Sequence, residues 1–338
     1  MYLFVAHFML DFSAVIPETQ QNLSFGYVEV LIQEHRQELF SGLMRISYPS
    51  GENFVFMFLD GVQQKLYRCL KTNIEIVEHQ SWSQVLNHPG AAVGFLALGV
   101  DGLRLIRIIC EAPIQEEQAS LSSNELVDRV RLWADNPEPG FIYIRSENAH
   151  RFHVLAGNPN PVIEELNVTA GQARFLIGDA SFAQSLPNSD YKTSYYLSTA
   201  EHDAWREYKL GLAFHPLMRI LITRFGELAG RVLAERLGGQ LTDWVTGSGW
   251  NMSINSNGVV NREFFDSLEE ALEVYMGILR RFRDEAGLAV GPRLVENMFR
   301  ETLMNLPPVF RDILNQYMYG LFSPGSSALI AQKEITQL

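Results

Sequence analysis

The stretch Phe40–Arg68 constrains the fold of this chain more than any other segment. Residues 44–48 alternate between apolar and polar, as expected for a strand with one buried face. After a polar turn, residues 54–59 are apolar at every position, which predicts a central strand covered on both faces. Residues 60–61, Asp-Gly, end that strand sharply, and residues 62–70 predict another. The segment is therefore expected to contribute strands to a largely antiparallel sheet.

The same order of elements occurs twice in the first half of the chain. Residues 25–39 have helical spacing and precede the first copy. Both copies have the same order: a helix, a glycine, a strand, a polar turn, an apolar strand and a second glycine. The two glycines are 19 residues apart in one copy (Gly42 and Gly61) and 17 in the other (Gly140 and Gly157). This recurrence predicts a degenerate tandem repeat of one α/β unit, with chance similarity of two ordinary helix–hairpin units as the alternative.

Long helices are predicted for the C-terminal half. A broad apolar stripe predicts a helix over residues 201–237, which Pro216 is expected to kink or break. Gly238-Gly239 is expected to interrupt this helix, and a shorter helix should continue to Val245. The glycines at 226 and 230 lie inside the stripe, where a close helix–helix contact explains them better than phosphate binding.

An Asn-Gly pair between alternating residues predicts a β-hairpin at 250–260. Ser267 and Glu270 have the spacing of a capping box and are expected to start the next helix, which Gly287 should end. Two further helices are predicted at residues 292–305 and 308–321.

The predicted fold class is α+β: tandem small helix-plus-antiparallel-sheet units followed by a mainly helical domain containing one hairpin. A polar linker is expected at 116–123, and residues 103–110 fit either a helix or a strand. The predicted divisions are residues 9–117, residues 118–199, residues 200–322 and a flexible tail at 323–338.

Composition narrows the function classes. The chain has 338 residues and a formal net charge of -12, which disfavours general binding to the phosphate backbone of nucleic acids. Cys69 and Cys110 lie in apolar runs and are predicted to be reduced, buried thiols rather than a disulfide. No metal-site spacing of the CxxC kind occurs, so no metal or other cofactor is predicted.

The N-terminal run is apolar, carries no Lys or Arg, and is interrupted by Asp11. It therefore lacks the basic start of a signal peptide and the length of a membrane span. These features predict a cytoplasmic protein without a membrane span. Because a second methionine stands at position 9, residues 1–8 are either an upstream extension or part of a first strand.

A pattern of glycines, apolar residues and two polar residues marks the first hairpin. It consists of Ser41, Gly42, Leu43, Ile46, Gly51, Phe56, Phe58, Asp60 and Gly61. This pattern resembles the PatA-like N-terminal domain, a bacterial family of unknown molecular function that pairs a helix with a hairpin. The resemblance covers residues 25–68, and residues 125–162 form a second, weaker copy if the repeat is real.

The resemblance implies a signalling adaptor and not a catalyst. Members of the family commonly accompany response regulators and Ras-like GTPase switches of bacterial polarity and motility, so one of these systems is the expected partner. The family supplies no catalytic residue. The sequence shows neither a phosphoacceptor receiver domain nor a P-loop, so any switch has to come from the partner.

The main basic cluster consists of Arg280, Arg281, Arg283 and Arg293, with Arg300 nearby in sequence. In an acidic chain, such a cluster could dock an acidic partner or an anionic ligand such as a nucleotide. The alternative is a solvated C-terminal helix end, where cations complement the macrodipole.

Other candidate residues favour structural roles. His150 and His153 are three apart on a predicted strand and face opposite sides, which makes a poor metal pair. His202 with Asp203 could act as an acid–base pair, but acidic residues in a first helical turn more often serve as caps. The aromatic residues Trp205, Tyr208, Trp244 and Trp250 are more often core than a ligand cage.

Three functions remain open from the sequence. The leading hypothesis is a non-enzymatic cytoplasmic adaptor in bacterial signal transduction that binds a protein partner. Its helical domain is expected to self-associate, because the apolar stripe from Leu212 to Leu237 exceeds what one small helical domain can bury. The alternatives are a sensor of an anionic small molecule, bound by Arg280 or Arg293, and an unrecognised enzyme.

Overall fold

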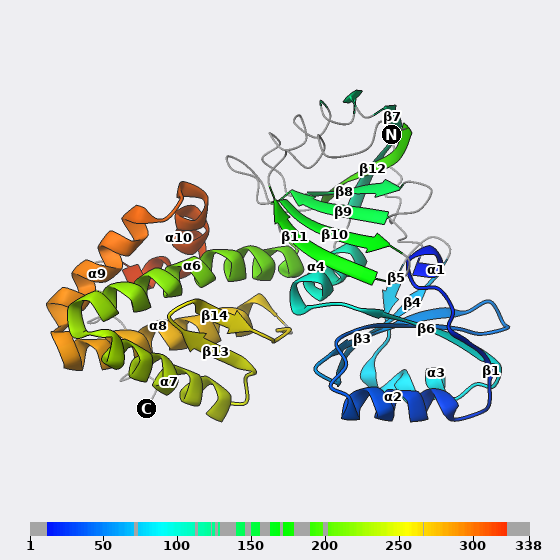
Figure 1. Ribbon diagram of the computed structural model, residues 1–338, viewed down its shortest axis with the longest axis horizontal. Coiled ribbons are helices and arrows are strands. Elements are labelled where there is room, and N and C mark those ends of the chain that lie inside the picture. The colour runs from blue at the N-terminus through cyan, green and yellow to red at the C-terminus, as the bar shows by residue number, and fades with distance from the viewer. Residues whose placement is uncertain are drawn as a thin grey trace. The chain divides into compact units, whose positions relative to one another are not determined.

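The computed structural model divides into two compact units, residues 1–205 and residues 206–338, and each is described by itself (Figure 1). The first unit contains two antiparallel sheets, and the second is mostly helical with one hairpin, which confirms the predicted α+β class. The structure describes residues 12–70, 74–111, 114–122, 124–125, 128, 140–145, 150–155, 163–169, 172–178, 190–198, 202–265 and 267–322.

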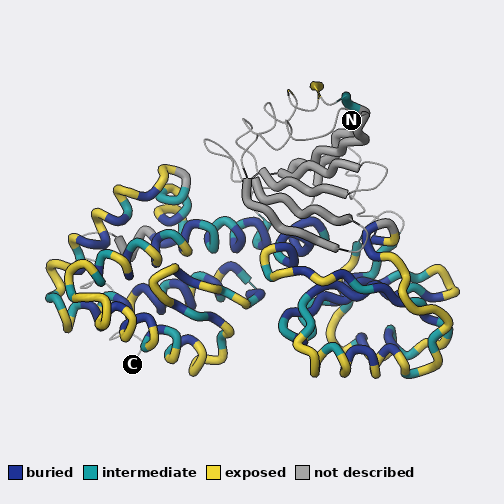
Figure 2. Tube along the Cα trace, in the orientation of Figure 1, coloured by how far each residue is buried: buried dark blue, intermediate teal, exposed yellow. Residues whose placement is uncertain are grey.

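Six antiparallel strands form the first sheet, in the order β1-β6-β2-β3-β4-β5. These strands are β1 (Gln20–Leu23), β2 (Gly42–Ser47), β3 (Asn53–Leu59), β4 (Val62–Cys69), β5 (Ile74–Ile76) and β6 (Ala91–Ala97). Strand β3 lies between β2 and β4, and all its residues from Phe54 to Leu59 are buried (Figure 2). The prediction of a central strand covered on both faces is therefore confirmed.

Helices cover both faces of this sheet. Helices α2 (Tyr27–Gln37) and α3 (Trp82–Leu86) lie on one face, and α1 (Phe12–Val15) and α4 (Val100–Glu111) lie on the other (Figure 1). The buried side of α2, with Val28, Leu31 and Ile32, packs on an aromatic-rich core that includes Phe54, Phe56, Phe58 and Trp82. Of the two alternatives left open for residues 103–110, the structure adopts the helix.

The Asp60-Gly61 turn joins β3 to β4. Both residues have positive φ, 50° and 76°, as a type I′ hairpin turn requires. The backbone N–H of Asp60 donates a hydrogen bond to the Ser41 hydroxyl over 2.8 Å. A Cβ atom at Gly61 would lie 2.6 Å from the carbonyl oxygen of Arg36, because the turn packs against the last turn of α2. The glycine at position 61 is therefore required because this turn packs closely against α2.

The second sheet has the order β11-β10-β9-β8-β12-β7, with all neighbours antiparallel. Residues 116–123 were predicted as a linker, but most of them belong to β7, which pairs along its whole length with β12. Polar side chains do not prevent pairing here because β7 is an edge strand, where solvent reaches one side. The strands are β7 (Ile114–Ser122), β8 (Gly140–Arg145), β9 (His150–Leu155), β10 (Ile163–Thr169), β11 (Gln172–Gly178) and β12 (Asp190–Ser198).

The tandem repeat expected in the first unit is not tested by the described residues and stays a prediction. The helix expected after Ser122 lies largely outside the described residues, as do the turns of the second copy and the tail at 323–338. The division of residues 9–199 into two units likewise stays a prediction.

The second unit consists of helical segments and a hairpin. They are α6 (Asp203–Ala229, whose first three residues belong to the first unit), α7 (Arg231–Gly247), β13 (Met252–Asn255), β14 (Gly258–Asn261), α8 (Leu268–Val290), α9 (Pro292–Asn305) and α10 (Pro308–Phe322). The predicted hairpin at 250–260 is confirmed, with Asn255 opposite Gly258. The Ser267 hydroxyl accepts a hydrogen bond from the backbone N–H of Glu270, as the capping box predicted. Among the described helices, none is long and apolar enough to cross a membrane.

Three predicted helix boundaries are wrong. Pro216 lies inside α6 without breaking it, because the residues before and after it pack in one core. The alternative, a kink at Pro216, stays a prediction. The first long helix ends at Gly230, and α7 runs through Gly238-Gly239. Gly238 instead permits close approach of the hairpin, since a Cβ there would lie 2.9 Å from the Ile254 carbonyl oxygen. Helix α8 passes Gly287 and ends at Gly291.

The helical unit contains an internal repeat that the sequence analysis missed. Helices α6–α7 and α8–α9 are two helical hairpins in which most buried positions coincide when the numbering is shifted by 61, the separation of Gly230 and Gly291. On the first hairpin these positions are Leu210, Ala213, Phe214, Leu217, Met218, Leu221, Phe225, Ala234, Leu237, Leu241 and Val245. On the second they are Ala271, Val274, Tyr275, Ile278, Leu279, Phe282, Ala286, Val295, Met298, Thr302 and Leu306.

Each hairpin turns on a single glycine with the same backbone conformation. Gly230 has φ 97° and ψ 151°, and Gly291 has φ 92° and ψ 142°. The N–H of each donates a hydrogen bond of 2.9 Å to the carbonyl of the glycine four residues earlier, Gly226 or Gly287. This conformation is essentially restricted to glycine, so both corners depend on that residue type.

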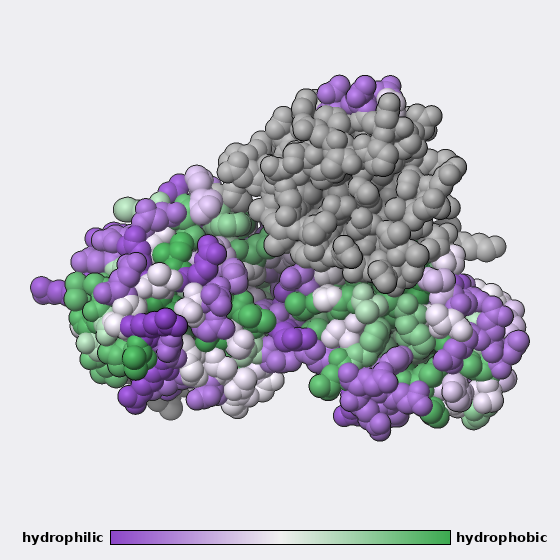
Figure 3. Space-filling view, viewed as in Figure 1, coloured by the Kyte–Doolittle hydropathy of each residue, from purple (hydrophilic) through white to green (hydrophobic). Residues whose placement is uncertain are grey.

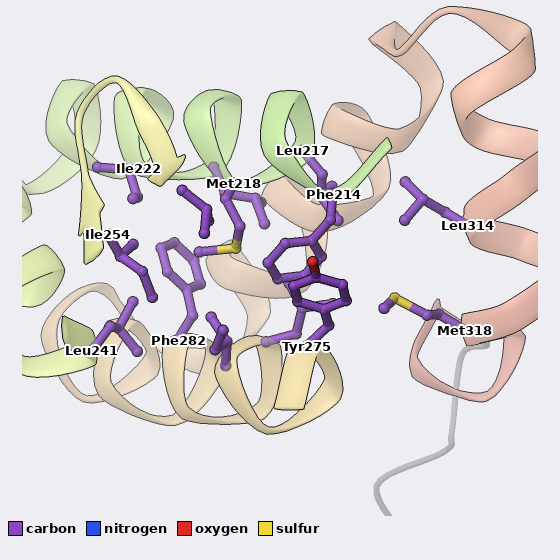
Figure 4. Packing of buried hydrophobic residues seen from close by; sticks show 14 of the residues in the cluster. Phe214, Leu217, Met218, Ile222, Leu241, Ile254, Tyr275, Phe282, Leu314 and Met318 are labelled. Carbon is purple, nitrogen blue, oxygen red and sulfur yellow. The ribbon is translucent and has the colours of Figure 1, made fainter. Parts of the chain in front are cut away.

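The two hairpins share one core (Figure 4). Phe214 and Tyr275, which are equivalent in the repeat, stack with their ring centroids 4.3 Å apart. Met218 and Phe282 lie beside this stack, and Leu241 lies close to Ile254 of the hairpin (Figure 4). Most of the stripe from Leu212 to Leu237 is therefore buried within the unit, but Leu228, Val232 and Leu233 are exposed. Self-association through the stripe stays a prediction.

We expect Gly230→Ala and Gly291→Ala each to lower the free energy of unfolding by about 1–3 kcal/mol, because alanine rarely adopts their backbone conformation. Gly239→Ala is the control: this glycine is exposed in the interior of α7 with open space around it, so alanine should stabilise by about 0.5–1 kcal/mol. Urea unfolding followed by circular dichroism measures all three. Equal effects at the three positions would contradict the corner geometry.

Candidate functional surfaces

A buried polar cluster joins α4 to the first sheet. Glu111 accepts a hydrogen bond of 2.9 Å from the Tyr67 hydroxyl and one of 3.1 Å from Nε of Arg107. Burial, followed by the negative charge of Glu111, raises the pKa of Tyr67 well above its ordinary range. The Arg107 and Glu111 side chains are 6% and 8% exposed. A paired and nearly inaccessible carboxylate fits a structural role: it fixes α4 on β4.

Arg45 performs a similar task on the same face of the sheet. Its guanidinium donates hydrogen bonds of 3.3 Å to the Ile16 carbonyl and 3.4 Å to Asn53, and lies 3.5 Å from the Glu18 carboxylate. These contacts attach the segment between α1 and β1 to the centre of the sheet. Burying an arginine costs free energy unless its donors are satisfied, and here three different groups satisfy them.

Both cysteines are free thiols, as the sequence predicted, but they are half-buried and not fully buried. Burial raises the pKa of Cys69 to about 12, although the charge of Arg45 opposes the shift. Burial, with smaller contributions from Cys69 and Glu111, also raises the pKa of Cys110. Neither thiol is therefore activated as a nucleophile at neutral pH.

The proposed acid–base pair lies at the start of α6. Nδ1 of His202 accepts a hydrogen bond of 3.3 Å from the backbone N–H of Ala204. Burial lowers the pKa of His202, against the opposing charges of Glu111 and Asp203. A neutral imidazole that accepts from a first-turn amide acts as a helix cap, which favours the structural interpretation. His150 and His153 lie on β9, and their side chains are outside the described residues.

Arg280, Arg281 and Arg283 lie within α8 and not at its C-terminal end, and Arg293 lies in the first turn of α9. Arg281 pairs with Glu285 over 3.2 Å. Arg283 lies 3.8 Å from Glu296, with its guanidinium 5.2 Å from the centre of the Phe299 ring. Arg280 and Arg293 are exposed. The macrodipole interpretation is wrong because α8 continues to Val290. The docking hypothesis also weakens, since two of the guanidinium groups already meet carboxylates of this chain.

The aromatic residues of the C-terminal half are structural. Trp205 and Tyr208 are buried. Trp244 packs on the helical core against Gly277, where a Cβ would lie 2.6 Å from the indole ring. The ring of Trp250 lies 5.3 Å from that of Phe265. Core packing therefore accounts for the predicted aromatic set.

The outer side of α2 is the first surface that the sequence analysis missed. Phe25, Tyr27 and Val30 are exposed there, and Phe25 is 69% exposed. Val30 is out of phase with the buried residues Val28 and Ile32, as positions two apart on a helix must be. The periodicity of the buried stripe, taken alone, could have identified Tyr27 and Val30 as outward-facing apolar residues.

Carboxylates surround these apolar residues. Glu29, Glu34 and Glu38 are exposed on or beside α2. Residues 1–205 contain 24 acidic and 13 basic residues, whereas residues 206–338 contain 15 acidic and 14 basic residues. Almost all of the negative charge of the chain thus belongs to the first unit. A helix face that combines exposed apolar side chains with this field suits a basic, amphipathic partner segment.

Among the described residues, no group of three or more His, Cys, Asp and Glu side chains is arranged to hold a metal ion. A scan against models of protein families gives no match, and a comparison with curated proteins gives none either. The resemblance to the PatA-like N-terminal domain stays a prediction.

Glu111→Ala should lower the free energy of unfolding by about 3–5 kcal/mol, because it removes the buried carboxylate that bonds both Arg107 and Tyr67. The matched control is Glu235→Ala. Arg231 and Glu235 form the same i,i+4 pair over 2.7 Å, but these side chains are 90% and 56% exposed, so the loss should stay below about 1 kcal/mol. Urea unfolding monitored by circular dichroism gives both values. Similar losses would show that the buried cluster does not fix α4.

Both thiols should react slowly with a thiol reagent such as dithionitrobenzoate in the native protein at pH 8. The reason is that burial keeps them protonated and shields them. In concentrated urea both should react at the rate of a free cysteine, which provides the internal control. Rapid native reaction of either thiol, resolved with Cys69→Ala and Cys110→Ala, would contradict the assigned burial.

Proposed function

We propose that this protein is a non-enzymatic regulatory adaptor of bacterial signal transduction, which acts in the cytoplasm by binding a protein partner through the outer side of α2. The observation that carries the proposal is the exposure of Phe25, Tyr27 and Val30 on a helix whose other side is fully used in the core. Soluble domains usually leave apolar side chains exposed singly, and several together on one element mark an interaction surface.

The chemistry of the surface supports a basic partner segment. Apolar contacts with Phe25 and Val30 would supply affinity, and Glu34 with its neighbouring carboxylates would orient the segment and accelerate association. Basic residues on the partner would compensate for the negative charge of the first unit. From the resemblance of residues 25–68, the expected partner class is a response regulator or a small GTPase system. Free Cys69 and Cys110 support a reducing compartment such as the cytoplasm.

A photoreactive amino acid in place of Val30 tests the proposal in cells of the organism that makes the protein. We expect covalent capture of a specific partner from this position. The control carries the same group in place of Ile76, which is 51% exposed on β5 at the edge of the same sheet. The same products from both positions, or no product from Val30, would count against an α2 interface.

Charge reversal provides a second control in the same experiment. Glu34→Lys should abolish or strongly reduce the crosslink from position 30, whereas Glu235→Lys in the other unit should leave it unchanged. The yield should also fall with added salt, because screening weakens attraction between exposed charges. A crosslink that is insensitive to Glu34→Lys and to salt would exclude a basic partner segment.

A further inference from the structure

The fold of the first unit brings its two cysteines to the same place from different elements. Cys69 is the last residue of β4, and Cys110 is the next-to-last residue of α4. Successive side chains of a strand point to opposite faces, so Cys69 shares a face of the sheet with Tyr67 and not with Arg68. The Tyr67 hydroxyl donates a hydrogen bond of 2.9 Å to Glu111, the residue that follows Cys110. Cys69 therefore faces the end of α4 that carries Cys110.

Arg68 marks the opposite face of the same strand. Its guanidinium carbon lies 6.0 Å from the centre of the Phe54 ring, and Phe54 belongs to the core that α2 covers. Hydrophilic side chains gather over α2, on this side of the sheet (Figure 3). Neighbouring positions of β4 thus point to different helices, Arg68 toward the α2 side and Cys69 toward α4.

Two further observations bring the two sulfur atoms close to each other. In the sheet, Cys69 lies opposite Ile74 of β5, and β5 is in contact with α4. Burial raises the pKa of Cys110 most, and the charge of Cys69 raises it more than the charge of Glu111 does, although Glu111 is the next residue in the chain. Electrostatic interaction weakens with distance, so the larger effect indicates the nearer group.

From this geometry we propose that Cys69 and Cys110 form a site of reversible oxidation, at which a small disulfide such as oxidised glutathione converts the two thiols into one intramolecular disulfide. The thiolate of one cysteine attacks oxidised glutathione and expels one glutathione thiolate. The second cysteine attacks the protein sulfur of this mixed disulfide and expels the other. Each protein thiol gives its proton to a departing thiolate, so the protein is oxidised and the small disulfide is reduced to two thiols.

The half-buried positions of both cysteines determine how the site reacts. Burial keeps the thiols protonated, so the first attack is slow. Once a mixed disulfide has formed, the second thiol is already held beside it, and closure of the intramolecular bond outruns a second attack on glutathione. The bond joins the end of α4 to the end of β4 and closes a loop of about 40 residues, which stabilises the fold by restricting the unfolded chain.

Equilibration of the full chain in glutathione buffers with an increasing oxidised fraction tests the proposal. The products are trapped with acid, free thiols are alkylated, and intact mass spectrometry identifies each form. We expect a chain that has lost two hydrogens, carries no glutathione, takes up no alkylating agent and unfolds at a higher temperature than the reduced chain. Starting from reduced or from oxidised protein should give the same oxidised fraction, and dithiothreitol should restore both thiols.

The matched control moves one thiol to the other face of the sheet. A chain that combines Cys69→Ala with Arg68→Cys keeps almost the same spacing to Cys110, but it should form no intramolecular disulfide while its circular dichroism stays native. Equal formation of the bond in this variant would overturn the proposal.

Three results with the wild-type chain would also overturn the proposal. They are a stable mixed disulfide on either cysteine, a disulfide between two chains, and thiols that remain reduced at equilibrium in the most oxidising buffer. None of these results bears on partner binding by the outer side of α2, which lies on the other face of the sheet.

Discussion

A backbone conformation that only glycine readily adopts determines the geometry of the helical unit. Gly230 and Gly291 reverse the chain within one residue, so α6 packs on α7 and α8 on α9 without a connecting loop. Because both corners have the same conformation, the two hairpins are equivalent and share one core around Phe214 and Tyr275. The same compactness leaves Val232 and Leu288, which lie beside the corners, exposed.

The first unit depends on carboxylates that compensate for the arginines buried under its helices. Its sheet is covered on both faces, so α4 and the segment before β1 have to lie over a strand layer that also contains Tyr67 and Arg45. Glu111 and Glu18 compensate for the buried guanidinium groups; Glu111 is itself buried, whereas Glu18 lies at the surface beside Arg45. The carboxylates on α2 are external and have few partners, which makes that helix the place where the negative charge of the unit meets apolar side chains.

The sequence by itself determined those features that depend on neighbouring residues. The strands of the first sheet, the Asp60-Gly61 turn, the cap at Ser267 and the helix from Pro292 to Asn305 follow from alternation, turn chemistry and helical spacing. Tertiary structure decided where packing outweighs local preference. Pro216 stays inside a helix because the residues before and after it pack in one core. Gly238 permits close approach of the β-hairpin and does not interrupt its helix. The polar strand β7 pairs because it lies at the edge of its sheet. The repeat of the helical unit was hidden because its halves share burial positions rather than residue types. Arg281 and Arg283 were a basic cluster in the sequence, but only the fold showed that Glu285 and Glu296 already neutralise them.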